Sequence, residues 1–116
     1  MEKKNVIREK SFEFALNAID LYKKMLTEKE YVISKQLLRS ATSVGANVEE
    51  AVSGASRRDF INKLVIAQKE ARETCYWLRL LQKSSLVTIN VSPNLDKADE
   101  LVRILTAIVK TSQATN

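Results

Sequence analysis

The sequence has 116 residues, of which 45% are hydrophobic and 28% are charged, and it contains two glycines and one proline. This length fits one domain, residues 1–116, and this composition excludes disordered, collagen-like and turn-rich all-β chains. Histidine is absent and cysteine occurs once, which excludes Ser-His-Asp and Cys-His catalysis, histidine-ligated or four-cysteine zinc sites, and intrachain disulfides. The net charge is +5, and residues 56–84 alone carry +4, so the positive excess is concentrated in one segment.

Apolar residues recur at helical spacing nearly throughout and predict four helices, at about residues 5–26, 32–53, 57–84 and 93–112. The first helix carries two adjacent apolar stripes, beginning at Phe14 and at Ala15, which give it a wide apolar face. We expect the charged run 27–30 to be a loop or a frayed helix end. In the second helix an apolar seam runs from Leu37 to Ala55 at 4-3-4-3-4 spacing, which favours packing in a bundle.

The third predicted helix repeats this spacing, and Ser56 followed by Asp59 predicts a hydrogen-bonded start. Residues 85–91 include four apolar side chains, but one strand cannot form a sheet alone, so we expect a loop. Ser92 predicts the N-cap of the fourth helix. Four amphipathic helices joined by short connections predict an all-α fold, an antiparallel up-down-up-down four-helix bundle.

The first ten residues are charged without a following apolar stretch, and no window approaches 18 consecutive apolar residues. We therefore expect a cytoplasmic protein that does not bind membranes. Gly45 and Gly54 are the only glycines, and they cannot form either a dinucleotide-binding fingerprint or a phosphate-binding P-loop. Since histidine is absent as well, we expect no enzymatic activity, no cofactor, no metal ion and no small-molecule substrate.

Three segments resemble a known family. Residues 34–51 read SKQLLRSATSVGANVEEA, residues 67–78 read AQKEARETCYWL, and residues 10–25 read KSFEFALNAIDLYKKM. Together they resemble the bacterial four-helix-bundle proteins of the 23S ribosomal RNA intervening-sequence protein family, which are similar to accessory proteins of diversity-generating retroelements. The resemblance implies a closed bundle, a ring-shaped homo-pentamer and no known enzymatic activity. Nucleic-acid binding is attributed to the similar retroelement protein.

A basic stripe lies on one face of the third predicted helix, away from its apolar seam. Its members recur at helical spacing and are Arg58, Lys69, Arg72, Tyr76, Arg79 and Lys83. A row of cations that includes an aromatic side chain suits phosphate contacts and base stacking, so these residues are candidates for binding RNA or DNA. The alternative is a solvated basic face that keeps the protein in solution. No zinc-finger or RNP-like pattern is present, so we expect no strong sequence preference.

A structural polar network is expected between the second and third helices. Its members are Gln36, Arg39, Ser43, Asn47, Glu70 and Glu73. Two carboxylates one turn apart beside Trp77 could indicate acid–base or metal chemistry, but a ferritin-like di-iron site needs histidine. In an antiparallel hairpin of these helices Arg39 lies level with Arg72 and Glu73. We therefore predict an interhelix ion pair between Arg39 and Glu70 or Glu73.

Self-association is predicted from small residues between Ser40 and Ala46 and from Ile66, Trp77 and Leu80, which lie outside the main apolar seam. Such a surface favours a homo-oligomer, and five copies is the number that the resemblance implies. The leading hypothesis is a non-catalytic oligomeric bundle that binds RNA or DNA through the basic stripe. The alternative is a protein-interaction scaffold without a nucleic-acid ligand. Binding by cations should weaken steeply with salt, whereas apolar docking should not.

Overall fold

The computed structural model describes the backbone of residues 2–114 and the side chains of residues 6–114. Within that range the chain forms four helices and no strand. The helices are α1 (Glu2–Thr27), α2 (Ile33–Val52), α3 (Arg57–Ser84) and α4 (Ser92–Ala114). The predicted all-α fold with four helices is confirmed. The main differences are that α1 begins before residue 5 and α4 continues past residue 112.

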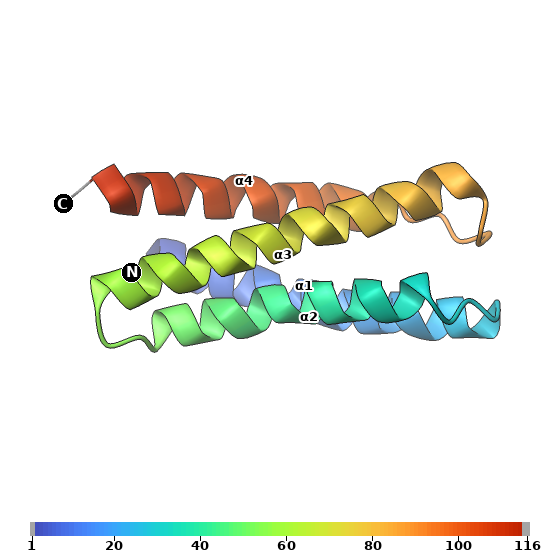
Figure 1. The fold of residues 1–116 in the computed structure, drawn as a ribbon, viewed down its shortest axis with the longest axis horizontal. Coiled ribbons are helices and arrows are strands. Elements are labelled where there is room, and N and C mark those ends of the chain that lie inside the picture. Colours follow the sequence, from blue (N-terminus) through green and yellow to red (C-terminus); the bar gives the residue numbers. More distant parts are fainter. Residues whose placement is uncertain (1, 115–116) are drawn as a thin grey trace.

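The four helices form an elongated bundle that measures 48 by 21 by 21 Å. Figure 1 shows that the chain reverses direction at each connection, so that successive helices run antiparallel. Each helix contacts the next one along the chain, and α1 also contacts α4, which closes the bundle. The α2–α3 contact is the most extensive and the α1–α4 contact the least. The α2–α3 hairpin is therefore the best-connected part of the molecule.

The core is built from the apolar seams of all four helices. Leu37 and Val48 of α2, Leu78 of α3 and Leu105 of α4 are each at most 1% exposed. Their helical spacing brings one side of every helix into the same apolar interior, and burial of these side chains is the main stabilising contribution to such a fold. The connection between α3 and α4 is a loop, as predicted, and it adds apolar side chains of its own to this core.

Glu30 caps α2, in a segment where we expected only a loop or a frayed end. Its carboxylate accepts hydrogen bonds from the backbone N–H groups of Val32 and Ile33 at 3.0 Å and of Ser34 at 2.6 Å. The side chain is 8% exposed. Burial by itself raises the pKa of Glu30, but the three backbone donors outweigh it, so the pKa lies below its usual value. A charged carboxylate therefore satisfies the free N–H groups at the start of α2.

The starts of α3 and α4 differ from each other in how well the sequence predicted them. The Asp59 N–H donates to the Ser56 hydroxyl at 3.1 Å, so the predicted start of α3 is confirmed. The predicted N-cap at Ser92 is wrong, because Ser92 is already helical and its own N–H donates to the Asn90 side chain at 3.1 Å. Its hydroxyl instead accepts a hydrogen bond from Gln82 on α3 at 3.0 Å. Asn90 therefore satisfies the first N–H group of α4, and the Ser92 hydroxyl serves a contact between helices instead.

Candidate nucleic-acid interface

The basic stripe lies on the outer side of α3, opposite the buried seam of that helix. All six predicted members are exposed: Arg58, Lys69, Arg72, Tyr76, Arg79 and Lys83. Tyr76 is 52% exposed and lies between the cations. Because α3 is continuous from Arg57 to Ser84, its helical geometry holds the members of the stripe on one face.

The cations of the basic stripe have no acidic partner among the described side chains. The ion pairs in residues 6–114 join Arg8 to Glu49, Lys10 to Glu100, Arg39 to Glu70 and Glu73, and Lys63 to Glu50. None of them includes a cation of the stripe. The positive charge of this face is therefore available to an anion in solution.

Arg39 on α2 bridges the two carboxylates of α3, as predicted. Its guanidinium donates to Glu70 at 3.2 Å and also to Glu73. The Arg39 side chain is 48% exposed, and those of Glu70 and Glu73 are 22% and 35% exposed. Burial by itself raises the pKa of Glu73, but the donors from Arg39 and Trp77 outweigh it, so the pKa lies below its usual value. The pair is partly screened by water, which limits its contribution to stability.

The rest of the predicted polar network is less connected. Asn47 donates to the backbone carbonyl of Ser43 at 2.8 Å, one turn earlier in the same helix. Gln36 is exposed, and its side chain makes no hydrogen bond within the described part of the chain. The network that joins α2 to α3 therefore consists of Arg39, Glu70 and Glu73 rather than all six residues.

A buried hydroxyl pair, which the sequence did not predict, also joins α2 to α3. Ser40 and Thr74 are both 0% exposed, and their hydroxyl oxygens lie 2.8 Å apart. The Thr74 hydroxyl also donates to the Glu70 backbone carbonyl at 2.8 Å. Thr74 shares the helical spacing of the buried seam of α3, and Ser40 is the first of the small residues of α2. Their level positions on antiparallel helices were the signal that could have paired them.

Trp77 connects the polar network to the basic stripe. Its indole Nε1–H donates to Glu73 at 3.0 Å, and its ring meets the ring of Tyr76 edge-on, with centroids 5.2 Å apart and an interplanar angle of 64°. Aromatic side chains prefer this T-shaped geometry because the positive ring edge meets the negative ring face. Tyr76 thus contacts Trp77, and the hydrogen bond to Glu73 holds the Trp77 indole in place.

The thiol of Cys75 on α3 also has a hydrogen-bond partner within the chain. The half-buried Cys75 thiol donates to the Asp99 carboxylate on α4 at 3.3 Å. Burial and the neighbouring Asp99 raise the pKa of the Cys75 thiol to about 12. Across the described residues, no three side chains of the metal-binding types are grouped so that they could hold a metal ion. No helix in the described range has the length and apolar character needed to span a membrane.

Exposed apolar side chains occur on α3, as predicted, and also on α1. On α3, Ile66 is 40% exposed and Leu80 is 36% exposed, whereas Trp77 is half-buried against the core. On α1, Phe12 is 62% exposed and Leu16 is 50% exposed, and neither was singled out from the sequence. Phe12 and Leu16 lie one helical turn apart and outside both predicted apolar stripes, and this spacing was the signal that could have found them.

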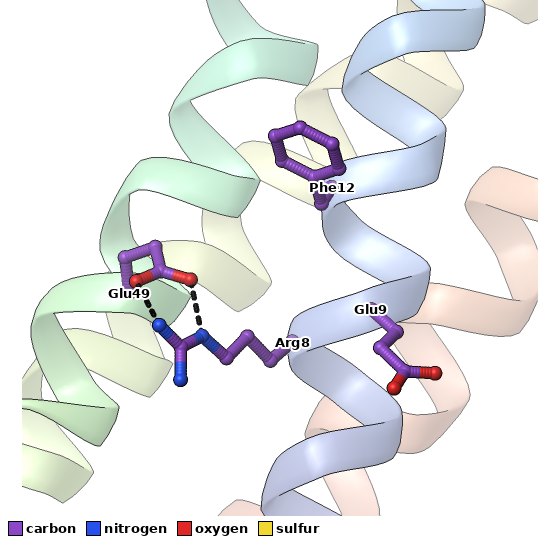
Figure 2. A pocket seen from close by; sticks show the side chains of 4 residues that line it. All are labelled: Arg8, Glu9, Phe12 and Glu49. Atoms are coloured by element: carbon purple, nitrogen blue, oxygen red, sulfur yellow. Dashed lines mark hydrogen bonds and ion pairs between the residues drawn. The ribbon is translucent and has the colours of Figure 1, made fainter.

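At least one of the small residues of α2 allows close packing against another helix of the same chain. Gly45 lies so close to α1 that a Cβ atom there would be 3.3 Å from the backbone carbonyl oxygen of Ser11. Beside this contact, Arg8, Glu9, Phe12 and Glu49 line a surface pocket of about 340 Å³. Figure 2 shows the Arg8 guanidinium reaching across from α1 to Glu49 on α2, while Glu9 points away from that pair. No predicted site residue lines this pocket.

Comparison with known proteins agrees with the resemblance. The family model described as 23S rRNA-intervening sequence protein matches residues 3–107. The chain is also similar to the crystal structure of a protein of unknown function from the S23 ribosomal protein family of Bacteroides thetaiotaomicron VPI-5482, with 47% identity and a TM-score of 0.88. The match covers 93% of this chain and 98% of that one. No curated protein matches significantly. The chain therefore belongs to the 23S rRNA-intervening sequence protein family.

Proposed function

We propose that this protein is a non-catalytic, homo-oligomeric four-helix bundle that binds RNA or DNA through the basic stripe of α3, without strong sequence preference. The observation that carries the proposal is the row of exposed cations without a carboxylate partner in residues 6–114. Cations of this kind bind phosphates and release the counterions of the nucleic acid. Phosphate contacts fix the position of a ligand but do not read its sequence.

The homo-oligomeric part of the proposal is supported by exposed apolar side chains on two helices. Phe12 and Leu16 on α1, and Ile66 and Leu80 on α3, are each between 36% and 62% exposed. Phe12 and Leu16 lie one turn apart on α1, and neighbouring exposed apolar side chains favour contact with a partner. A second copy of this chain is the partner that we propose, and light scattering at micromolar concentration should report a mass several times 13.1 kDa. A monomer would contradict this part of the proposal.

The same apolar side chains favour the second candidate, a scaffold that binds another protein and no nucleic acid. The two functions differ in their salt dependence. Binding through several cations weakens steeply as salt rises, whereas docking through Ile66 and Leu80 depends little on salt.

The test of nucleic-acid binding removes charge from the basic stripe. In the triple variant Arg72→Gln, Arg79→Gln, Lys83→Gln, affinity for an oligonucleotide should fall. The slope of log affinity against log salt should also become shallower by about 2 to 3, since each lost phosphate contact removes about one unit or slightly less. Fluorescence anisotropy over a range of salt concentrations measures both quantities.

The matched control removes the same charge from α1 and α2, with the substitutions Lys23→Gln, Lys24→Gln and Lys35→Gln. These three lysines are exposed and lie on α1 and α2 rather than on α3. The control should bind almost as tightly as the parent. Equal losses in the two triple variants would show that net charge alone drives binding. Either that result or a parent that does not bind at low salt would refute the nucleic-acid proposal.

A further inference from the structure

A continuous series of contacts leads from α2 to the centre of the basic stripe. The Arg39 guanidinium binds Glu73, the same carboxylate oxygen of Glu73 accepts the Trp77 indole N–H at 3.0 Å, and the Trp77 ring meets the Tyr76 ring. Each contact restricts the side chain that follows it. The polar network between α2 and α3 therefore reduces the freedom of the Tyr76 ring, which is itself 52% exposed.

The cations are arranged on both sides of that ring. Arg72 and Arg79 lie about one helical turn before and after Tyr76, and Lys69 and Lys83 lie two turns away. On α3 these positions share one face, so a strand that follows the helix axis could contact cations before and after the ring. The Tyr76 ring then faces the part of the strand that lies between the bound phosphates.

A phenol ring in that position distinguishes single strands from duplexes. In a duplex the base faces are stacked on one another, so a ring on the protein surface reaches a base face only if two base pairs are unstacked, which costs free energy. In a single strand a base face is free to stack on the ring while the flanking phosphates contact the cations. Cations alone would bind both forms.

We propose that the basic stripe binds single-stranded nucleic acid and that Tyr76 is the ring on which a base stacks. In this proposal Trp77, Glu73 and Arg39 are positioning residues, which act by holding Tyr76. The proposal rests on the proposed function and adds the strandedness of the ligand and the residue that recognises it. Stacking on an aromatic side chain contributes about 5- to 150-fold in affinity per base.

The experiment compares Tyr76→Leu with Tyr76→Phe in the full chain. The probes are an oligouridine, an oligothymidine, a mixed duplex of equal length and inorganic polyphosphate, and the readout is fluorescence anisotropy or competition. Tyr76→Leu should lower the affinity for both single strands by about 5- to 150-fold and leave the duplex and polyphosphate within about twofold. Tyr76→Phe should bind like the parent, because stacking needs the ring and not the hydroxyl.

Tyr31 provides the matched control. It is 54% exposed, like Tyr76, but it lies in the connection between α1 and α2. Tyr31→Leu should leave all four affinities unchanged. Trp77 is the single tryptophan of the chain, so its fluorescence reports directly on the contact with Tyr76. The single strands should change that fluorescence, whereas polyphosphate should not.

Two results would overturn the stacking proposal while nucleic-acid binding stands. One is an equal loss of affinity for single strands and duplex in Tyr76→Leu, and the other is no loss for any probe. A parent that binds none of the probes would instead refute the proposed function itself. The positioning role is tested with Glu73→Gln and with Trp77→Phe, which should each lower the affinity for single strands more than the affinity for the duplex. An equal loss of affinity for single strands and for the duplex would show that Glu73 and Trp77 have only a structural role.

Discussion

The side of α3 that faces α2 and the side that faces outward both carry charged residues, but only the inner side pairs them. Arg39 binds the two glutamates of α3, whereas Arg72, on the outer face, has no ion pair within residues 6–114. On the inner side, charge helps to define which positions of two antiparallel helices lie level. On the outer side, charge of the same chemical kind makes no ion pair within residues 6–114, which leaves it available to a ligand.

The largest contrast is expected between two leucines of α3. Leu78 is 0% exposed and Leu80 is 36% exposed. Leu78→Ala should lower the free energy of unfolding by about 2–5 kcal/mol, because it leaves a cavity in the core. Leu80→Ala should cost less than about 1 kcal/mol. Urea denaturation at low protein concentration measures both, and similar losses in the two variants would contradict the distinction between the two sides.

Acid should act on the partnered carboxylates. The pKa values of Glu30 and Glu73 lie below their usual value in the folded chain, so their contribution to stability is complete above the unfolded pKa. It is lost as the pH falls through the folded pKa values. Glu30→Gln should lower the free energy of unfolding by about 0.5–2 kcal/mol at neutral pH and should make it less sensitive to acid.

The control for the acid experiment is Glu13→Gln, since Glu13 is an exposed carboxylate of α1. Thermal unfolding of the parent and both variants at neutral and acidic pH gives the comparison. Equal pH dependence in the parent and in Glu30→Gln would show that the cap of α2 does not depend on a charged carboxylate.

The smallest expected effect distinguishes Arg39 from Arg72. Arg39→Ala should lower the free energy of unfolding by less than about 1 kcal/mol, because the Arg39 side chain is half exposed and its ion pairs are screened. Arg72→Ala should change stability by no more than about 0.5 kcal/mol but should weaken duplex binding, which Arg39→Ala should leave intact. If Arg72→Ala destabilised the fold more than Arg39→Ala, the outer side would have a structural role.

The sequence was sufficient to predict the four helices and the ion pair of Arg39, because both follow from regular spacing. A helix repeats every 3.6 residues, and an antiparallel hairpin fixes which positions lie level. The start of α3 was also predictable, since Ser56 directly precedes the helix and Asp59 lies in its first turn. These features all depend on residues close in sequence or related by one hairpin.

Features that depend on side-chain reach or on competing partners were not predicted. Glu30 caps α2 from outside the helix with a longer side chain than the usual capping residues have. Ser92 was assigned a cap, but its hydroxyl is bound by Gln82. Phe12 is exposed and lies outside both apolar stripes that the sequence predicted for the first helix. Spacing identifies an apolar face but not the part of it that the same chain covers.

The burial of Cys75 and its hydrogen bond to Asp99 have a practical consequence for labelling. Thiol reagents react with the thiolate, and a pKa of about 12 leaves almost none of it at neutral pH. Cys75 is the single cysteine of the chain, so a second cysteine introduced at Lys69 or Lys83 offers one fast-reacting site without removal of the first. A dye or spin label attached there would report on the basic stripe from about two helical turns before or after Tyr76.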